Sequence, residues 1–587
     1  MDGKVHLPGG WRVRLRPPHL AGVDAPASRR QPCFAGARRS GRPTGCQRGR
    51  LPMHITFLGH AGFVVETAGA IVVMDPWLSS RGAFDSAWMQ LPCNHHLAPR
   101  VREKLETPGK ARYLYVSHEH KDHFDPEFLA TLRQRDFTVL VPRFHRSELQ
   151  DVFARYGCKQ VIACEDGHEV PIKGGYVKLF VSEQGTNRDS AVMVRGDGQC
   201  FLNINDCKLH DRMGRIVAEE GPIDVFSAQF SGAIWHPTCY EYPAETYAAI
   251  SLKKRESKFE AVARTLEVIQ PRAYIAAAGP AAFLDPAQFH LNFEKVNIFP
   301  NATQLFAFLR QRLPQGKTRY LEPMPGDVLD AKSLEFVSQV AERVTPENMK
   351  AYLHAYAKRQ ESVFRERRRN LLVAEVAEIH ERLRVELQRK LDLLDLHERV
   401  GMPLYVELTE LPDRLLRVDF KSRRVHVVAD IQEEVRYTLK TSAADVGRVL
   451  DRKLTWEDFL LSFRLRLSRN PDVYEPVLHG FLGVEIEDMR EFCDGIRSTE
   501  SQRERTVVEA GGRRFSIQRF CPHQGADLSE GWVEEGRYLV CPRHRWQFDL
   551  DAGGVCTQNT STLCAELLPE REQEKPQTPA TDPQPQL

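Results

Sequence analysis

Four residues toward the end of the sequence carry its strongest chemical signal. Cys521 and His523 form a C-x-H motif, and after 17 further residues Cys541 and His544 form a C-x-x-H motif. Each motif supplies one thiolate and one imidazole, so two thiolates suit one iron of a [2Fe–2S] cluster and two imidazoles suit the other. Gly525 and a proline in each motif favour tight loops whose backbone N–H groups approach the sulfides. The spacing predicts an iron–sulfur centre held between two adjacent turns.

A zinc site is the alternative for the same four side chains. Zinc fingers pair two cysteines in one motif and two histidines in another, whereas each motif here contains one of each. This order, the prolines and the following Trp546-Gln547-Phe548-Asp549 resemble the Rieske domains of oxygenases and their ferredoxins. The respiratory-complex type carries an extra cysteine in each loop, but Gly525 and Ala526 follow the first motif here. The resemblance therefore implies an oxygenase-type cluster.

A second group of candidate metal ligands directly follows the apolar run 113–116. His118, His120, Asp122 and His123 form an H-x-H-x-D-H motif. A loop at the end of a buried strand projects such side chains into one cleft, where they can hold one or two divalent metals. A solvated histidine-rich surface turn is the alternative interpretation.

This motif resembles the metallo-β-lactamase superfamily, in its ascorbate-6-phosphate-lactonase-like branch. The segments Gly59-His60-Ala61-Gly62-Phe63 and Asp75-Pro76-Trp77 match the same signature. The resemblance implies an αββα sandwich in which His118 and His120 serve one metal and Asp122 and His123 the other. Asp206, at the end of a later strand, matches the carboxylate that bridges the two metals.

The match departs from the superfamily at one ligand. A further histidine usually lies between the first motif and the bridging aspartate, but the expected strand end reads Val181-Ser182-Glu183-Gln184-Gly185. Glu183 is one substitute, and His60, His236 and His290 are others, although a single histidine of this kind is more often structural than a ligand. This departure favours non-haem iron with mixed histidine and carboxylate ligands over a two-zinc hydrolase site, with zinc as the alternative metal.

Bulk composition excludes several classes of protein. The net charge of +2 argues against nucleic acid as the main partner, and no apolar run approaches the 18 residues of a membrane span. Thirteen cysteines, an odd number, occur without a secretory signal, which indicates a reducing, cytoplasmic location.

The sequence predicts a multidomain α/β and β protein. We expect a disordered arginine-rich extension over 1–52, a lactamase-like domain over 53–330, a helical and α+β middle segment over 331–484, a Rieske β-domain over 485–568 and a disordered tail over 569–587. Within the middle segment, residues 345–400 are predicted to be helical with an apolar face that includes Leu372 and Leu394. Thr455 is predicted to cap a further helix.

The two metal motifs together resemble the CMP-N-acetylneuraminate hydroxylases, although the Rieske domain here is last rather than first. The resemblance implies an O2-dependent monooxygenase. A ferredoxin, cytochrome or reductase would reduce the cluster, which would pass electrons to iron beside a small-molecule substrate such as a sugar nucleotide. A lactonase-type hydrolase with a redox-regulatory Rieske domain is the alternative, and there Asp122 would orient a metal-bound hydroxide. A non-catalytic electron carrier is the third interpretation.

Overall fold

The computed structural model describes residues 53–145, 149–184, 187–367, 371–501, 504–522, 525–543, 545–559 and 561–569. The expected extension over 1–52, most of the expected tail and the two histidines His523 and His544 lie outside these residues. Residues 51–587 form one compact unit.

Two large sheets make up the first half of this unit. The strands of the first sheet are, in spatial order, β15 (Phe336–Ser338), β14 (Val328–Asp330), β1 (His54–Gly59), β2 (Gly62–Glu66), β3 (Ala70–Met74), β4 (Ala111–Tyr115), β5 (Thr138–Pro142) and β6 (Gln160–Cys164). Those of the second are β13 (Arg319–Leu321), β12 (Ala273–Ala277), β11 (Val225–Gln229), β10 (Gln199–Asn203), β9 (Asn187–Gly196), β8 (Gly175–Gln184) and β7 (Glu169–Ile172). The apolar runs 70–74, 113–116, 177–181 and 200–204 of the sequence all fall on or across these strands.

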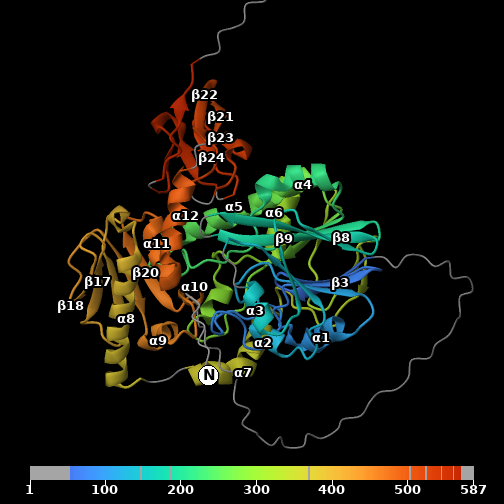
Figure 1. The fold of residues 1–587 in the computed structure, drawn as a ribbon, viewed down its shortest axis with the longest axis horizontal. Coiled ribbons are helices and arrows are strands. Elements are labelled where there is room, and N and C mark those ends of the chain that lie inside the picture. Colours follow the sequence, from blue (N-terminus) through green and yellow to red (C-terminus); the bar gives the residue numbers. More distant parts are fainter. Residues whose placement is uncertain are drawn as a thin grey trace, which may run out of the picture. The chain divides into compact units, whose positions relative to one another are not determined.

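Helices cover the outer face of each sheet (Figure 1). The first sheet packs against α1 (Ala98–Glu106), α2 (Pro126–Ala130) and α3 (Leu149–Arg155), and the second against α4 (Met213–Glu220), α5 (Ala244–Ile269) and α6 (Ala302–Arg312). A third apolar layer, with residues such as Phe63, Val72, Leu179 and Phe201, joins the two sheets. This αββα arrangement confirms the predicted lactamase-like fold.

The middle segment contains a five-stranded sheet with helices packed against it. The strands are, in spatial order, β18 (Arg424–Val428), β17 (Leu415–Asp419), β16 (Leu404–Leu408), β19 (Arg436–Thr441) and β20 (Leu465–Asn470). The helices are α7 (Met349–Arg367), α8 (Val373–Leu393), α9 (Ala443–Leu450), α10 (Trp456–Leu461) and α11 (Pro476–Gly483). Thr455 caps α10 as predicted, because its hydroxyl accepts from the backbone N–H of Asp458 at 3.0 Å.

One detail of the predicted helical stretch over 345–400 is wrong. The stretch forms two helices, α7 and α8, and Leu372 lies directly before the second. Leu372 is 71% exposed, whereas Leu383, Leu387 and Leu391 are buried on the apolar face of α8. The spacing of three and four residues would place Leu372 on that face only if α8 began one turn earlier. The helix begins at Val373 instead.

A buried charge network joins the middle segment to the lactamase-like part. Asp85 accepts from Arg367 at 2.8 Å and also pairs with Arg448, while Asp285 lies 3.2 Å from Arg464. The Arg464 side chain is only 6% exposed, so this contact is desolvated rather than a surface pair. The middle segment is therefore held against the sandwich.

The last part of the chain follows α12 (Met489–Ser501) and consists of two small sheets. One contains β21 (Arg505–Ala510), β22 (Arg513–Gln518) and β27 (Glu566–Leu567), and the other contains β23 (Trp532–Glu534), β24 (Tyr538–Val540), β25 (Gln547–Asp549) and β26 (Val555–Cys556). They enclose a core that contains both Cys521 and Cys541. Strand and turn are what the sequence predicts here, and the domain bounds themselves stay a prediction.

Candidate metal centre

Strand ends from both large sheets bring the candidate ligands together. The loop after β4 carries His118, His120, Asp122 and His123, while Asp206 follows β10 of the facing sheet. His123 Nε2 lies 3.5 Å from Asp206 Oδ1. Two segments about 80 residues apart therefore meet at one edge of the sandwich, as the carboxyl ends of strands in α/β folds commonly do.

His60 completes a compact cluster. One ligand atom each from His60, Asp122 and His123 lies within 4.8 Å of the other two, and all three residues are buried. His60 occupies the turn between β1 and β2 with a left-handed backbone (φ 51°), which points its Nε2 to Asp122 Oδ2 at 3.1 Å. Of the four further candidates proposed for the shell, His60 is the one that this cluster includes.

Three buried atoms in the cluster fit a metal ion. Asp122 Oδ1, His123 Nε2 and Asp206 Oδ1 have no hydrogen-bond partner within the part of the chain that the structure describes. Buried polar atoms are normally paired, because leaving one unpaired costs about 1–3 kcal/mol. A divalent metal among these two carboxylates and two imidazoles would satisfy all three atoms.

Neighbouring groups fix the orientation of His123. Its Nδ1 lies 2.9 Å from Asp75 Oδ2, and the same carboxylate accepts from the backbone N–H and hydroxyl of Ser117, each at 2.8 Å. A carboxylate that holds one imidazole nitrogen leaves the other free to face a metal. Asp75 therefore acts as a positioning residue for His123.

His118 and His120 form a second, adjoining group. His118 Nε2 lies 2.8 Å from His120 Nδ1, and the His118 ring centroid is 4.3 Å from that of His123. Asp189, on β9, approaches His118 Nδ1 at 3.2 Å, and Glu457, in the first turn of α10, approaches His120 Nε2 at 3.3 Å. The motif histidines thus contact carboxylates from two other elements.

Sequence reasoning missed both of those carboxylates. Asp189 lies opposite Ser182 in the β8–β9 ladder, so it occupies the strand next to the one inspected for the absent histidine. Glu457 belongs to the middle segment, and its approach depends on how that segment packs. The only sequence signal for Asp189 is its place on the partner strand of the 181–185 strand end.

The structure places the remaining candidates outside the cluster. Glu183 accepts from the backbone N–H of His145 at 2.7 Å and lies 3.7 Å from Arg188. His236 Nε2 lies 3.1 Å from the Tyr242 hydroxyl. His290 lies 3.8 Å from Glu294 on the same short helical segment. None of these three is among the side chains that gather around His123.

Electrostatics keep the cluster carboxylates ionised. Burial raises the pKa of Asp122, but the His123 and His60 imidazoles outweigh burial and hold that pKa at about 2. The pKa of Asp206 is also lowered, because His123 outweighs burial. Burial lowers the pKa of His120, yet Glu457 and Asp122 raise it to about 9. A metal ion at this position would replace that proton, as metal ligands require deprotonated donors.

The two cysteines of the C-terminal motifs lie in matching turns. Cys521 and Cys541 are both fully buried. The backbone N–H of Gly525 donates to the Cys521 carbonyl at 2.7 Å, and that of Arg545 donates to the Cys541 carbonyl at 2.9 Å. Gly525 has a φ of 57°, a conformation in which glycine carries no steric penalty. Two buried thiols on two equivalent tight turns fit the cysteine half of a [2Fe–2S] site.

A buried ion pair joins the turn that begins with Cys541 to the segment that follows Asp206. Arg543, between Cys541 and His544 in sequence, donates from Nε and Nη2 to the two carboxylate oxygens of Asp211, each at 3.0 Å. The two side chains are 4% and 2% exposed. Asp211 lies five residues after Asp206, so the contact joins the segment after Cys541 to the segment after Asp206.

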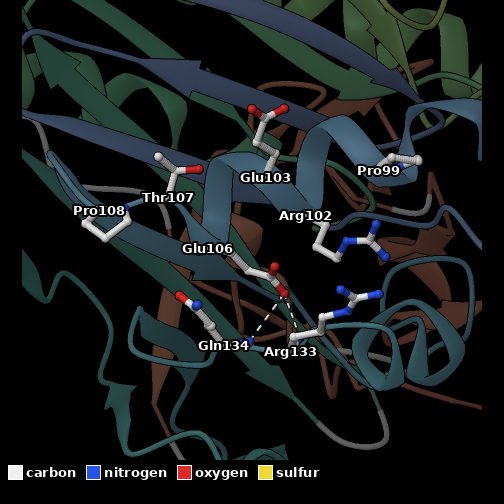
Figure 2. Close-up of a pocket in the computed structure, with 8 residues that line it drawn as sticks. All are labelled: Pro99, Arg102, Glu103, Glu106, Thr107, Pro108, Arg133 and Gln134. Carbon is white, nitrogen blue, oxygen red and sulfur yellow. Dashed lines mark hydrogen bonds between the residues drawn. The ribbon is translucent and has the colours of Figure 1, made fainter.

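The depression drawn in Figure 2 lies elsewhere. It is lined by Pro99, Arg102, Glu103, Glu106, Thr107, Pro108, Arg133 and Gln134, from α1 and the segment after α2. Glu106 there accepts from the backbone N–H groups of Arg133 and Gln134 at 2.5 and 3.3 Å (Figure 2). None of the candidate metal ligands lines it, so we assign it no role in the chemistry.

Comparisons with known proteins agree with both halves of this arrangement. Residues 488–568 match the Rieske [2Fe-2S] domain family, and residues 54–206 match the beta-lactamase superfamily domain. A Rieske 2Fe-2S iron-sulfur protein of Mycolicibacterium smegmatis is 29% identical over 88% of this chain and 100% of its own length.

Two further relatives are enzymes or parts of enzymes. The cytidine monophosphate-N-acetylneuraminic acid hydroxylase of Asterias rubens is 24% identical over 48% of this chain and 42% of its own. The ferredoxin component of the alkene monooxygenase system of Xanthobacter autotrophicus is 34% identical over 11% of this chain and 50% of its own. Across the described residues, no helix combines the length and apolar character that crossing a membrane needs. The chain thus joins a β-lactamase superfamily domain to a C-terminal Rieske [2Fe–2S] domain.

Proposed function

We propose that the chain is an O2-dependent Rieske monooxygenase that hydroxylates a small molecule. Electrons from an external donor (a ferredoxin, a cytochrome or a reductase) enter a cluster held by Cys521, His523, Cys541 and His544. They pass to non-haem iron held by His118, His120, Asp122, His123 and Asp206, with His60 beside them. Bound iron supplies the activation of O2 in such sites. The hydroxylase relative makes a sugar nucleotide one candidate substrate.

The buried Arg543–Asp211 pair is the observation that carries this proposal. Arg543 belongs to the turn that begins with Cys541, and Asp211 to the segment that begins with Asp206. Electron transfer between two centres requires them to be close, and a hydrolase has no need of a single-electron donor. A desolvated bidentate pair also fixes the orientation of the two partners more strictly than a surface contact does.

Lys208 provides a second link between the sites. Burial and Arg543 lower its pKa, while the charges of Asp189, Asp206 and Cys541 act in the opposite direction. One side chain therefore lies within electrostatic range of both the cluster thiol and the metal-site carboxylates.

The donor set supports iron over a pair of zinc ions. The strand end 181–185 offers no histidine, and the carboxylates of Asp189 and Glu457 approach His118 and His120. Mixed imidazole and carboxylate ligands with open positions are typical of non-haem iron oxygenases. Asp75 holds the tautomer of His123, and Glu457 lies 3.3 Å from His120 Nε2, where it can orient that ring.

Metal analysis of the anaerobically purified full-length protein, with electron paramagnetic resonance (EPR) of the reduced form, tests the proposal. About three or four irons per chain, two of them giving a Rieske signal, are expected. Iron with zinc would instead support the lactonase-type hydrolase, in which Asp122 orients a metal-bound hydroxide. About two irons and no further metal would support a simple electron carrier.

Matched variants sharpen the result. His120→Ala should lose the non-Rieske iron and all O2-dependent product, because it removes a ligand of that site alone. His290→Ala is the control, since the His290 side chain is 56% exposed and its ion-pair partner is Glu294 at 3.8 Å. Equal iron content in His120→Ala and His290→Ala would remove His120 from the ligand set.

A further inference from the structure

Helix α5 carries two lysines that are not among the candidate ligands of the metal centre. Lys254 and Lys258 lie four residues apart, so they share one face of the helix. The Lys258 ammonium donates to the Gln229 amide oxygen, and the Lys254 ammonium donates to the His236 carbonyl at 3.1 Å. Both contacts are to neutral oxygens. Two like charges at this spacing destabilise a helix, so something else must offset the pair.

Further cations surround these two lysines. Burial, Lys208, Arg469 and the neighbouring Lys258 lower the pKa of Lys254 to about 7. Burial and Lys208 lower the pKa of Lys258 to about 8, although Asp206 and Asp189 act in the opposite direction. The neighbouring cations thus oppose the protonated form of both lysines, and a bound anion would favour it.

The pKa values of three histidines are lowered by burial and by the same cations. Burial and Lys258 lower the pKa of His210 to about 4, and burial, Arg469 and Lys254 lower that of His479 to about 3. The pKa of His236 is lowered by burial, Lys254 and Arg469. These rings come from three separate segments, so the field extends across the region and is not local to one side chain.

The nearby acids already have partners. Asp211 pairs with Arg543, and Asp472 accepts from Arg469 Nε at 2.6 Å. Asp206 and Asp189 face His123 and His118. A divalent metal at the cluster would neutralise these last two carboxylates further and leave the lysines with a still larger excess of positive charge.

We propose that Lys254 and Lys258 form an anion-binding site beside the metal centre, which takes an oxyanion group, phosphate or carboxylate. Lys258 donates to Gln229, whose backbone N–H donates at 2.8 Å to the carbonyl of Asn205, the residue before Asp206. Lys254 lies about 6 Å further along α5, one helical turn away. That this anion is part of the substrate rests on the proposed function; that the site binds an oxyanion does not.

Thermal unfolding of the full-length, metal-loaded protein tests the site without turnover. Inorganic phosphate and acetate are titrated separately against chloride at constant ionic strength. A saturable rise in Tm with phosphate identifies a phosphoryl site, and one with acetate identifies a carboxylate site. Lys254→Met should weaken the apparent affinity by about tenfold or more, because it removes a charged donor. Lys253→Met, an exposed neighbour on the same helix, is the matched control.

The variants also separate a ligand role from a structural one. Without phosphate or acetate, Lys254→Met should be at least as stable as the wild type, because it removes charge repulsion. A lower Tm of Lys254→Met in chloride, or no oxyanion effect in the wild type, would overturn the site. An equal effect of phosphate on the Tm of Lys254→Met and of Lys253→Met would also overturn the site. If oxyanion binding is found but the second metal is zinc, the site stands and the monooxygenase proposal fails.

Discussion

Replacing Arg543 by methionine should lower the free energy of unfolding, because it breaks the contact between the turn that begins with Cys541 and the segment that follows Asp206. The Asp211 carboxylate is 2% exposed and takes two donors from Arg543 at 3.0 Å, so the variant leaves a buried charge without its partner. Removing one partner of a buried pair typically costs about 3–5 kcal/mol. Arg513→Met is the control, because the Arg513–Asp551 pair is 45% and 34% exposed and is expected to contribute about 1 kcal/mol or less.

A double-mutant cycle with Asp211→Leu measures the interaction itself. The Arg543→Met/Asp211→Leu protein should regain most of the loss, because two apolar side chains leave no buried charge. Urea unfolding followed by circular dichroism gives the free energies. Reoxidation of the reduced cluster by the metal centre, followed by EPR, should slow in Arg543→Met while the Rieske signal keeps its shape. A cost no larger than that of Arg513→Met, or additive single effects, would refute the reasoning.

Four other expectations can be checked with single variants. His120→Ala should keep the Rieske EPR signal but lose the second metal, as measured by metal analysis. Cys541→Ala should lose the Rieske EPR signal but keep the second metal. An unchanged Rieske signal would reject Cys541 as a ligand. Gly480→Ala should lower the free energy of unfolding by about 1–3 kcal/mol, because an added Cβ would lie 1.9 Å from Phe492 Cζ. Gly495→Ala, where no atom lies within 4 Å of the added Cβ, should stabilise α12 by about 0.5–1 kcal/mol in the same urea assay.

Local pattern was enough to predict the strands, whereas the αββα arrangement followed from the resemblance to the metallo-β-lactamase superfamily. Short apolar runs such as 70–74 and 113–116 are strands because a β-strand buried on both faces needs an unbroken apolar sequence. The cap at Thr455 was predictable for a similar reason, since its hydroxyl acts only three residues away. Leu372 was misplaced because helix periodicity does not mark where a helix begins.

The metal centre shows where local pattern stops being informative. The H-x-H-x-D-H motif is contiguous and could be recognised from spacing alone. His60, Asp189 and Glu457 reach the same place from a turn, a neighbouring strand and a helix of another segment. Their positions depend on long-range packing, which no spacing in the sequence encodes. The Arg543–Asp211 contact joins residues 332 positions apart and was unpredictable for the same reason.

Because Arg543 and Asp211 belong to one chain, the cluster does not have to find its acceptor by diffusion. A tethered partner experiences an effective concentration in the millimolar range when its linker is short. Under the proposed function, internal electron delivery would then proceed at the same rate in dilute and concentrated protein. Only the arrival of the external donor would follow second-order kinetics, and only that step would respond to the ionic strength of the solution.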